Sequence, residues 1–476
     1  MSELLEEIST EEAVQQSSLA FSEYKNLTPM KRFAFLEEIV ACLEAKKDLI
    51  IQTAMRESKL PEGRLNGEFG RTTGQIRLFQ NLIKEDGWKN EVIELADPTR
   101  TPVPKPDTRK SMVPLGPVVV FGASNFPLAF STIGGDSISA LAAGCTVLYK
   151  ANPAHLETSR LVNECIQEAI RNVGLSPFVF QHFDASGYEE GQQLVLHSLV
   201  KAVAFTGSFH GGKAIYDLAQ SRKEPIPVFA EMGSLNPVCF FESSLSTKAT
   251  ELAKTFAGSF TLGCGQFCTK PGLMIGVDSQ SWKVFVDQLI QEAGNAGGQA
   301  MLTSAIQANF TKGLDSLTPL EVKGTIEKGL VKPSVKCVSA KAFMSNCKLQ
   351  EEYFGPFTLV VTCADIAEMH ALIQSLEGQL TGTIVSETND DDAKSTMMLL
   401  TEKVGRIIFN AAPTGVEVNH SMVHGGPFPA TTDARFTSVG SDAIYRFVRP
   451  VCFQGIPQEW LPESLQTTSY KNIHRK

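Results

Sequence analysis

Residues 202–231, AVAFTGSFHGGKAIYDLAQSRKEPIPVFAE, contain the pattern that decides the fold. Apolar runs at 202–205 and 226–229 predict two strands, and residues 211–220 between them predict a helix. Two strands joined through a helix are parallel, because the helix returns the chain to the same end of the sheet. This stretch therefore indicates a parallel sheet whose two faces are covered by helices.

The same alternation of strands and helices extends towards the N-terminus as far as Pro117. It predicts strands at 118–121, 146–149 and 178–183, and helices at 131–143, 156–173 and 191–199. A second α/β stretch follows Glu231, with strands expected at 273–277, 357–361, 382–385 and 406–409. The pattern is typical of a doubly wound α/β fold, in which ligands bind at the carboxyl ends of the strands.

The N-terminal part of the chain, about 90 residues, has a helical pattern. Thr28 and Pro29 form a helix start, with a capping side chain followed by proline at the first helical position. Further on, the stretch 71–83 predicts a helix with an apolar side at Ile76, Phe79, Leu82 and Ile83. Residues 94–109 are polar and rich in proline, so we expect an exposed, extended arm there.

The composition is that of a large globular protein and argues against several function classes. The chain has 476 residues, of which 43% are hydrophobic and 20% charged, enough for about three domains. A net charge of −9 argues against nucleic acid or a membrane surface as the partner, because both attract cationic proteins. The acidic start MSELLEEIST does not resemble a secretory signal, and ten cysteines are too sparse for a disulfide framework. We therefore expect a cytoplasmic protein with reduced thiols.

A cysteine in a glycine-rich turn is the candidate nucleophile. Residues 263–272 read GCGQFCTKPG, a tight turn that can expose the Cys268 thiol among backbone N–H groups. A buried structural cysteine is the alternative, and the turn alone leaves both open. We expect no metal site, because Cys264 and Cys268 are not followed by a second pair of Cys or His at zinc-binding spacing.

Several short motifs follow one another in an order typical of one enzyme family. They are SNFP at 124–127, Lys150, FTGS at 205–208, EMG at 231–233, GQFC at 265–268 and EYFGP at 352–356. With this order and spacing the chain resembles the NAD(P)-dependent aldehyde dehydrogenases over nearly its whole length. Within that superfamily, GRTTGQ at 70–75 and HGGPFPATTDAR at 424–435 resemble the 2-ketoglutarate semialdehyde (2,5-dioxopentanoate) dehydrogenases.

The resemblance implies oxidation of an aldehyde to its acid through a cysteine thiohemiacetal and a thioester. Cys268 is then the nucleophile, and the Asn125 amide and the Cys268 backbone N–H stabilise the oxyanion. Glu231 is implied as the general base that activates water, with a pKa raised towards neutrality by burial. From local sequence alone, Asn125 would be a turn residue and Glu231 a surface carboxylate.

The resemblance also implies NADP or NAD as the cofactor. The turn 207–212, GSFHGG, differs from the common GxGxxG fingerprint but opens a helix whose N-terminus can approach the pyrophosphate. The implied cofactor-binding residues are Lys150, Gly207, Ser208, Gly212, Glu352 and Phe354. Three residues after Lys150, where a glutamate would disfavour NADP, the chain has Pro153, which favours NADP slightly.

A carboxylated substrate needs local positive charge on an acidic protein. Arg71, with Gln75 one turn later, lies in the helix that by the resemblance flanks the substrate tunnel, and a guanidinium suits bidentate carboxylate binding. The alternative is a surface arginine paired with Glu68. Arg435 is a second candidate, and Phe130 and Phe267 are expected tunnel walls.

The expected architecture has an NAD(P)-binding domain (1–93 and 114–232), a catalytic domain (233–437), an oligomerisation arm (94–113 and 438–458) and a C-terminal tail (459–476). Such a small β arm is not stable alone, so we expect a homodimer or homotetramer. The expected reaction is oxidation of 2-ketoglutarate semialdehyde to 2-ketoglutarate. The alternatives are a broad-specificity or fatty aldehyde dehydrogenase and a catalytically silent homologue.

Overall fold

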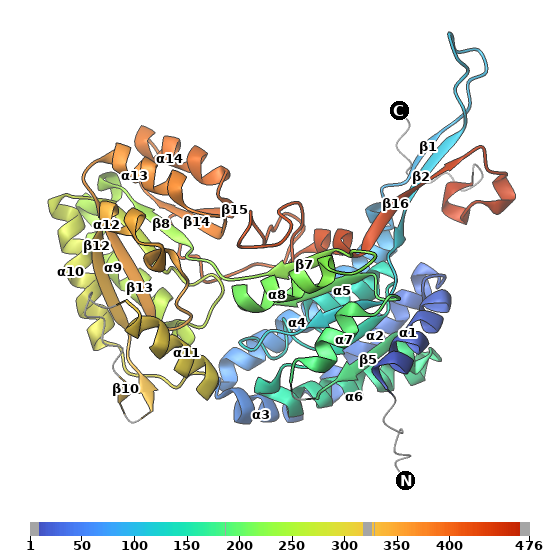
Figure 1. Ribbon diagram of the computed structural model, residues 1–476, viewed down its shortest axis with the longest axis horizontal. Coiled ribbons are helices and arrows are strands. Elements are labelled where there is room, and N and C mark those ends of the chain that lie inside the picture. The colour runs from blue at the N-terminus through green and yellow to red at the C-terminus, as the bar shows by residue number, and fades with distance from the viewer. Residues whose placement is uncertain (1–8, 186, 318–325, 328, 467–476) are drawn as a thin grey trace.

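The computed structural model describes residues 9–185, 187–317, 326–327 and 329–466, so residues 467–476 of the expected tail lie outside it. Two parallel sheets, each packed against helices, form the body of this part of the chain, and a three-stranded antiparallel sheet projects from it (Figure 1). The expected α/β class with a small β arm is confirmed.

The first parallel sheet contains the stretch that opened the sequence analysis. Its five strands are ordered β5(Phe180–Phe183), β4(Val147–Lys150), β3(Val118–Phe121), β6(Ala202–Thr206) and β7(Val228–Glu231). Parallel register pairs Val203 with Val228 and Thr206 with Glu231. Glu231 therefore lies at the carboxyl end of this sheet, where a doubly wound fold binds ligands.

Helices cover both faces of this sheet. They are α1(Thr10–Tyr24), α2(Pro29–Ala45), α3(Lys47–Ser58), α4(Glu62–Glu85), α5(Gly135–Ala143), α6(Leu156–Val173), α7(Glu189–Leu196) and α8(Phe209–Gln220). Successive side chains of a strand point to opposite faces. Val118 and Val120 accordingly pack in the core that includes α2, α4 and α6 residues, whereas Val119 packs in the core beside α1 and α7. Burial on both faces explains the continuous apolar run at 118–120.

The second parallel sheet has six strands. Their order is β12(Ser334–Ser339), β13(Phe357–Cys363), β9(Leu273–Val277), β8(Pro237–Phe240), β14(Gln379–Val385) and β15(Val404–Phe409). Its helices are α9(Glu242–Thr261), α10(Gln280–Asn295), α11(Ser304–Asp315), α12(Ala340–Ser345), α13(Ile366–Ser375) and α14(Asp391–Thr401). The sequence analysis did not predict β8, a buried four-residue strand that begins with proline, or β12, an edge strand without a continuous apolar run.

The arm consists of β1(Val92–Glu94), β2(Thr108–Pro114) and β16(Val448–Gln454) in antiparallel order. β2 pairs with β1 on one side and with β16 on the other, so β1 and β16 each have a free edge in the described chain. Figure 1 shows the arm extending well beyond both parallel sheets. Across the described ranges, no helix is long and apolar enough to cross a membrane.

The remaining elements are short. They are the strands β10(Ile326–Glu327) and β11(Leu330–Val331) and the 3₁₀ turns η1(Gly87–Lys89), η2(Pro153–His155), η3(Pro177–Val179), η4(Leu262–Gly265), η5(Cys347–Gln350), η6(Ser441–Phe447), η7(Gln458–Trp460) and η8(Glu463–Leu465).

Residues 410–440, which follow β15, cross from the second sheet back to the first and are called the return segment below. Phe428 O accepts a hydrogen bond from Gly378 N, just before β14, at 3.1 Å. Four residues later Thr432 N donates to Ala230 O of β7 at 3.2 Å, and Met232 N donates to Ala430 O at 2.8 Å. The return segment thus connects the two sheets beside the carboxyl end of β7.

Candidate active site

The loop that carries Cys268 joins η4 to β9 and has an unusual backbone. Gly263 and Gly265 have φ angles of +56° and +65°, which glycine adopts without strain. A Cβ atom at position 265 would lie 2.2 Å from the Gly355 carbonyl oxygen. Glycine is therefore required at 265 to let this loop pack directly against the segment 352–356.

Two buried side chains, Asn236 and Lys270, hold the same loop by hydrogen bonds to backbone carbonyls. Asn236 Nδ2 donates to the Cys268 carbonyl at 2.8 Å and to the Lys270 carbonyl at 2.9 Å. Lys270 Nζ donates to the carbonyls of Tyr353 and Phe357 at 2.9 and 2.8 Å. Because the Cys268 carbonyl is bonded to Asn236, next to β8, and Lys270 is bonded to the start of β13, Cys268 has a fixed position relative to β8 and β13.

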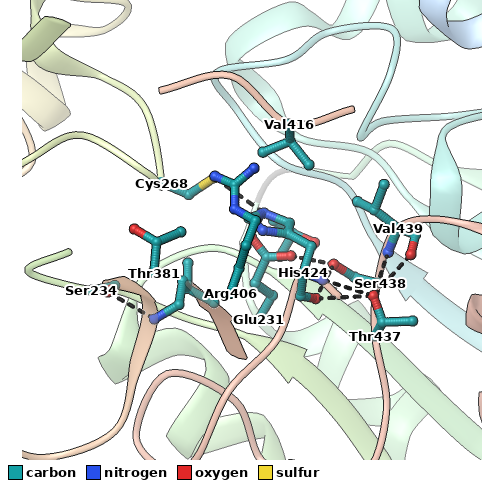
Figure 2. A network of polar contacts seen from close by, with 12 residues as sticks. Glu231, Ser234, Cys268, Thr381, Arg406, Val416, His424, Thr437, Ser438 and Val439 are labelled. Carbon is teal, nitrogen blue, oxygen red and sulfur yellow. Dashed lines mark hydrogen bonds and ion pairs between the residues drawn. The ribbon is translucent and has the colours of Figure 1, made fainter. Parts of the chain in front are cut away.

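The Cys268 thiol meets a histidine and a carboxylate from two other parts of the chain (Figure 2). His424 Nε2 lies 3.5 Å from Cys268 Sγ and 2.9 Å from Glu231 Oε1. Ser438 Oγ donates to the second carboxylate oxygen, Oε2. Glu231 and His424 are buried, and the reactive atoms of Glu231, Cys268 and His424 all lie within 4.8 Å of one another. We call these three residues the catalytic cluster.

The resting charge of the catalytic cluster resides on the carboxylate. Burial, followed by the charges of Glu231 and Glu352, raises the pKa of the Cys268 thiol well above its usual value. Burial would also raise the pKa of Glu231, but the contact with His424 and the hydrogen bonds of Ser438 and Cys268 lower it further than burial raises it. The expectation of a raised pKa for Glu231 is therefore wrong, because the partners of this carboxylate outweigh its desolvation.

His424 was not predicted as a site residue. It lies in the return segment, where Thr437 Oγ1 accepts from its backbone N–H at 2.9 Å and Ser438 N donates to its carbonyl at 2.9 Å. The only sequence signal was its place at the start of the motif 424–435. Its contact with Cys268 joins residues 156 positions apart, which no local pattern reveals.

Asn125 lies beside the Cys268 loop, as the motif implied. Its side chain is buried and donates from Nδ2 to the Gln266 carbonyl at 3.0 Å. Arg64 Nη2 of α4 donates to the Asn125 carbonyl at 2.7 Å, which fixes the backbone that carries the amide. Arg64 was not predicted either.

Arg71 lies next to the catalytic cluster rather than at the surface. Its Nη1 donates to the Val416 carbonyl, and its guanidinium lies 5.2 Å from the centre of the Phe130 ring. Its buried Nε and Nη2 have no hydrogen-bond partner among the described residues. The alternative pairing with Glu68 does not occur, because buried Glu68 accepts instead from the backbone N–H groups of residues 128 and 129 at 2.8 and 3.0 Å.

A second arginine of the site, Arg406 on β15, escaped the sequence analysis. It donates to the carbonyls of Gly415 and Pro413 at 2.7 and 2.8 Å, and its buried Nε has no partner in the described part of the chain. Burial and the nearby Arg71 lower its pKa, whereas the Cys268 thiol raises it. Two guanidinium groups with unused donors therefore lie near the thiol, and both hold the return segment at 413–416.

The remaining predicted substrate residues have different surroundings. Gln75 is buried and donates to the Ala129 carbonyl at 3.3 Å, so it supports a loop. The half-buried rings of Phe130 and Phe267 both pack against Phe126, at centroid distances of 5.3 and 5.5 Å. The structure does not bring Arg435 into this group, since its side chain is 81% exposed and pairs with Asp433.

Most of the predicted cofactor residues lie near the carboxyl ends of β4, β6 and β7. Lys150 Nζ donates to the Ala185 carbonyl at 2.7 Å and lies 3.7 Å from Glu190. Ser208 caps the N-terminus of α8 by accepting from Gly211 N at 3.2 Å. A Cβ at Gly212 would lie 2.7 Å from the Met232 side chain, so this glycine lets α8 pack closely on the end of β7.

Gly207 and the segment 352–354 complete this set. Gly207 N donates to the Glu231 carbonyl at 3.1 Å. Glu352 packs directly on the turn after β7, since a Cβ at Gly233 would lie 2.3 Å from its carboxylate oxygen. Burial raises the pKa of this carboxyl. Phe354 is half-buried two residues further on.

The chain is similar to known proteins over most of its length. A model of the aldehyde dehydrogenase family matches residues 4–428. An alpha-ketoglutaric semialdehyde dehydrogenase of Acinetobacter baylyi is 43% identical over 474 residues, which cover 98% of this chain and 90% of that protein. Alpha-ketoglutaric semialdehyde dehydrogenase 2 of Azospirillum brasilense is also 43% identical, over 475 residues and with the same coverage.

Solved structures share the fold at lower identity. A 1-pyrroline-5-carboxylate dehydrogenase from Thermus with bound NAD has a TM-score of 0.78 and 21% identity, covering 94% of this chain and 85% of that one. The glyceraldehyde-3-phosphate dehydrogenase of Methanocaldococcus jannaschii in complex with NADP has a TM-score of 0.76 and 18% identity, covering 94% and 93%.

Proposed function

This chain belongs to the aldehyde dehydrogenase family, and from that premise we propose that it oxidises 2-ketoglutarate semialdehyde to 2-ketoglutarate with NADP or NAD. The observation that carries the reaction is that the reactive atoms of Cys268, Glu231 and His424 lie within 4.8 Å of one another, while the Asn125 amide bonds to the Gln266 carbonyl on the same loop as Cys268. The substrate is supported by 43% identity, over 98% of the chain, to proteins named for this aldehyde.

In the first step Cys268 acts as the nucleophile. A bond forms between Sγ and the aldehyde carbon while the carbonyl π bond breaks, so the negative charge passes to the aldehyde oxygen. Asn125 Nδ2 has two N–H groups and gives one to Gln266, which leaves the other for this oxygen. The Cys268 backbone N–H is the second proposed donor, and each donor of this type typically contributes about 10²–10³ in rate.

In the later step Glu231 acts as a general base. A water molecule attacks the thioester carbon, its proton passes to the carboxylate, and the bond from carbon to Sγ breaks to release the acid and the thiolate. The lowered pKa of Glu231 supports this role in one respect, because the carboxylate is ready to accept a proton at neutral pH. Burial of the cluster strengthens every electrostatic interaction in it.

The cofactor-binding residues fit a dinucleotide by the chemistry of their donors. Lys150 supplies an ammonium group at the end of β4, and Ser208 with the N-terminus of the 12-residue helix α8 supplies a hydroxyl and backbone N–H groups for phosphate. Glu352 and Phe354 are the proposed contacts of the nicotinamide ribose and ring. When bound, NADP or NAD supplies the acceptor for the hydride. Pro153 brings no carboxylate that would repel a 2′-phosphate, which supports NADP slightly.

The carboxylate of the substrate is proposed to bind Arg71, with Arg406 as a second cation. The unused N–H groups on the buried part of Arg71 support this, because a buried donor without a partner costs free energy that an anionic ligand restores. A charged hydrogen bond of this kind contributes about 1.5–3 kcal/mol, or roughly 10- to 100-fold in affinity.

The test is a steady-state screen of a small aldehyde panel against NAD⁺ and NADP⁺, with wild type, Arg71→Ala and Arg77→Ala. Arg77 is the matched control, because it lies on the same helix and pairs with Glu44 at the surface. We expect Arg71→Ala to lower kcat/KM for the carboxylated aldehyde by roughly 10- to 100-fold and to spare an uncharged aldehyde of equal length. Equal losses on both aldehydes contradict the carboxylate role, and a preference for long uncharged aldehydes supports a fatty aldehyde dehydrogenase instead.

We also propose a cytoplasmic homodimer or homotetramer. The ten cysteines are all unpaired, as in a reducing compartment. The arm supports assembly, because its strands β1 and β16 each keep a free edge that another subunit can cover.

A further inference from the structure

We propose that His424 is a catalytic residue whose Nε2–H moves its hydrogen bond from the Glu231 carboxylate to the Cys268 thiolate when the nucleophile forms. This rests on the proposed function, because it concerns the same thiol. The observation behind it is that one imidazole nitrogen lies 2.9 Å from Glu231 Oε1 and 3.5 Å from Cys268 Sγ.

The protonation of His424 follows from its neighbours. Glu231 has a lowered pKa and is a carboxylate at rest, so its Oε1 can only accept a hydrogen bond. An atom 2.9 Å from this oxygen must therefore be a donor, which assigns the proton to Nε2. The other nitrogen, Nδ1, is buried with no partner among the described residues.

The proton transfer then conserves the charge of the cluster. The S–H bond of Cys268 breaks and its proton forms an O–H bond with Glu231, so that one negative charge moves from the carboxylate to sulfur. The Glu231 carboxylate, anionic at first, becomes neutral, and Cys268 Sγ, neutral at first, becomes anionic. Nε2–H lies between them and donates to whichever atom carries the charge. No new charge is created in a buried site, where one would be costly.

The same donor acts again when the thioester is hydrolysed. Before this step Glu231 releases the thiol proton to solvent and is a carboxylate again. Breakage of the bond from carbon to Sγ then leaves a thiolate, and the water proton is on Glu231, so Nε2–H again has sulfur as its anionic acceptor. Cys268 alone cannot form a thiolate readily, since burial and the charges of Glu231 and Glu352 raise the pKa of its thiol. Arg71 lowers the same pKa from α4, and Arg406 on β15 is the other cation near the thiol.

The experiment measures formation of the thiolate without any aldehyde. The full-length enzyme, free of cofactor, is alkylated with iodoacetamide over a range of pH. The Cys268 peptide is followed by mass spectrometry, because the exposed Cys337, Cys347 and Cys452 react as well. The variants are His424→Ala, His424→Gln, which keeps an N–H donor, and His370→Ala as a control. His370 is half-buried on α13, with Thr396 and Ser395 as partners.

We expect His424→Ala to move the midpoint of Cys268 alkylation to higher pH, with about tenfold slower alkylation below the midpoint. His424→Gln should recover part of this loss, and the control should match wild type. The kcat for aldehyde oxidation should follow the same order. An alkylation profile unchanged in His424→Ala overturns the proposal, as does an equal shift in His424→Ala and His424→Gln. A wild-type enzyme that alkylates as expected but oxidises no aldehyde would refute the proposed function instead.

Discussion

At the scale of the residue, the site depends on which atom carries the single negative charge of a buried cluster. Glu231 has a donor on each carboxylate oxygen, from His424 and from Ser438, which explains its ionised resting state. Cys268 lies within the same cluster and stays a thiol because of that charge and its own burial. The pKa values of the two groups are therefore linked, and a change in one must move the other.

Replacing Glu231 by Gln tests this link, and the sign follows from the cause. Its negative charge raises the pKa of Cys268, so its removal lowers that pKa and makes alkylation at a fixed pH near 8 faster. Aldehyde turnover should fall by about 10²–10⁴ in the same variant, because the base for water is lost. Peptide mass spectrometry and steady-state rates measure the two effects, with Glu387→Gln, which pairs with Lys248 at the surface, as the control. Slower alkylation in Glu231→Gln would contradict this prediction and show that the loss of Glu231 as acceptor of the thiol proton outweighs the loss of its charge.

At the scale of the element, one face of helix α4 supports the loop 125–129 and the return segment beside the site. Arg64, Glu68, Arg71 and Gln75 follow one another at intervals of four, three and four residues, the spacing that places side chains on one side of a helix. Three of them bind the loop 125–129, and Arg71 binds the return segment at Val416. The sequence analysis recognised only Arg71 and Gln75, because the apolar side of this helix gave the stronger periodicity.

Glu68 is the residue of this face whose loss should affect the loop 125–129 most directly. Glu68→Ala leaves the buried N–H groups of Leu128 and Ala129 without their acceptor, which costs about 1–3 kcal/mol for each unpaired group. We expect a lower Tm and a lower kcat, because Asn125 lies on the same loop. Glu68→Gln keeps an acceptor oxygen and should recover most of both. Thermal unfolding measures the Tm and steady-state kinetics measures the kcat of each variant. An unchanged Tm in Glu68→Ala would contradict the supporting role.

At the scale of the whole molecule, the site exists only where three parts of the chain meet. The first sheet supplies Glu231, the second supplies the Cys268 loop, and the return segment supplies His424 and Ser438 (Figure 2). The return segment also bonds to Gly378 and to β7, so it links the two sheets at the site.

The arm leads to the prediction about assembly. Its three strands are too few to be stable alone, and the free edges of β1 and β16 can pair with another chain. Size-exclusion chromatography with light scattering should therefore give about two or four times the chain mass of 51.8 kDa. A monomeric mass for the fully active enzyme would contradict this prediction.

The sequence by itself determined the α/β class and most of the strands, and it placed Cys268 in a glycine-rich turn. These features depend on short-range patterns: the apolar runs of buried strands, the caps of helices and the glycines around Cys268. The tertiary structure alone decided that His424 meets a thiol 156 residues away, that Arg406 lies near this thiol, and that the pKa of Glu231 is lowered rather than raised. The physical reason is that such contacts and electrostatic shifts depend on how the return segment crosses between the two sheets, and no periodicity within a single segment carries that information.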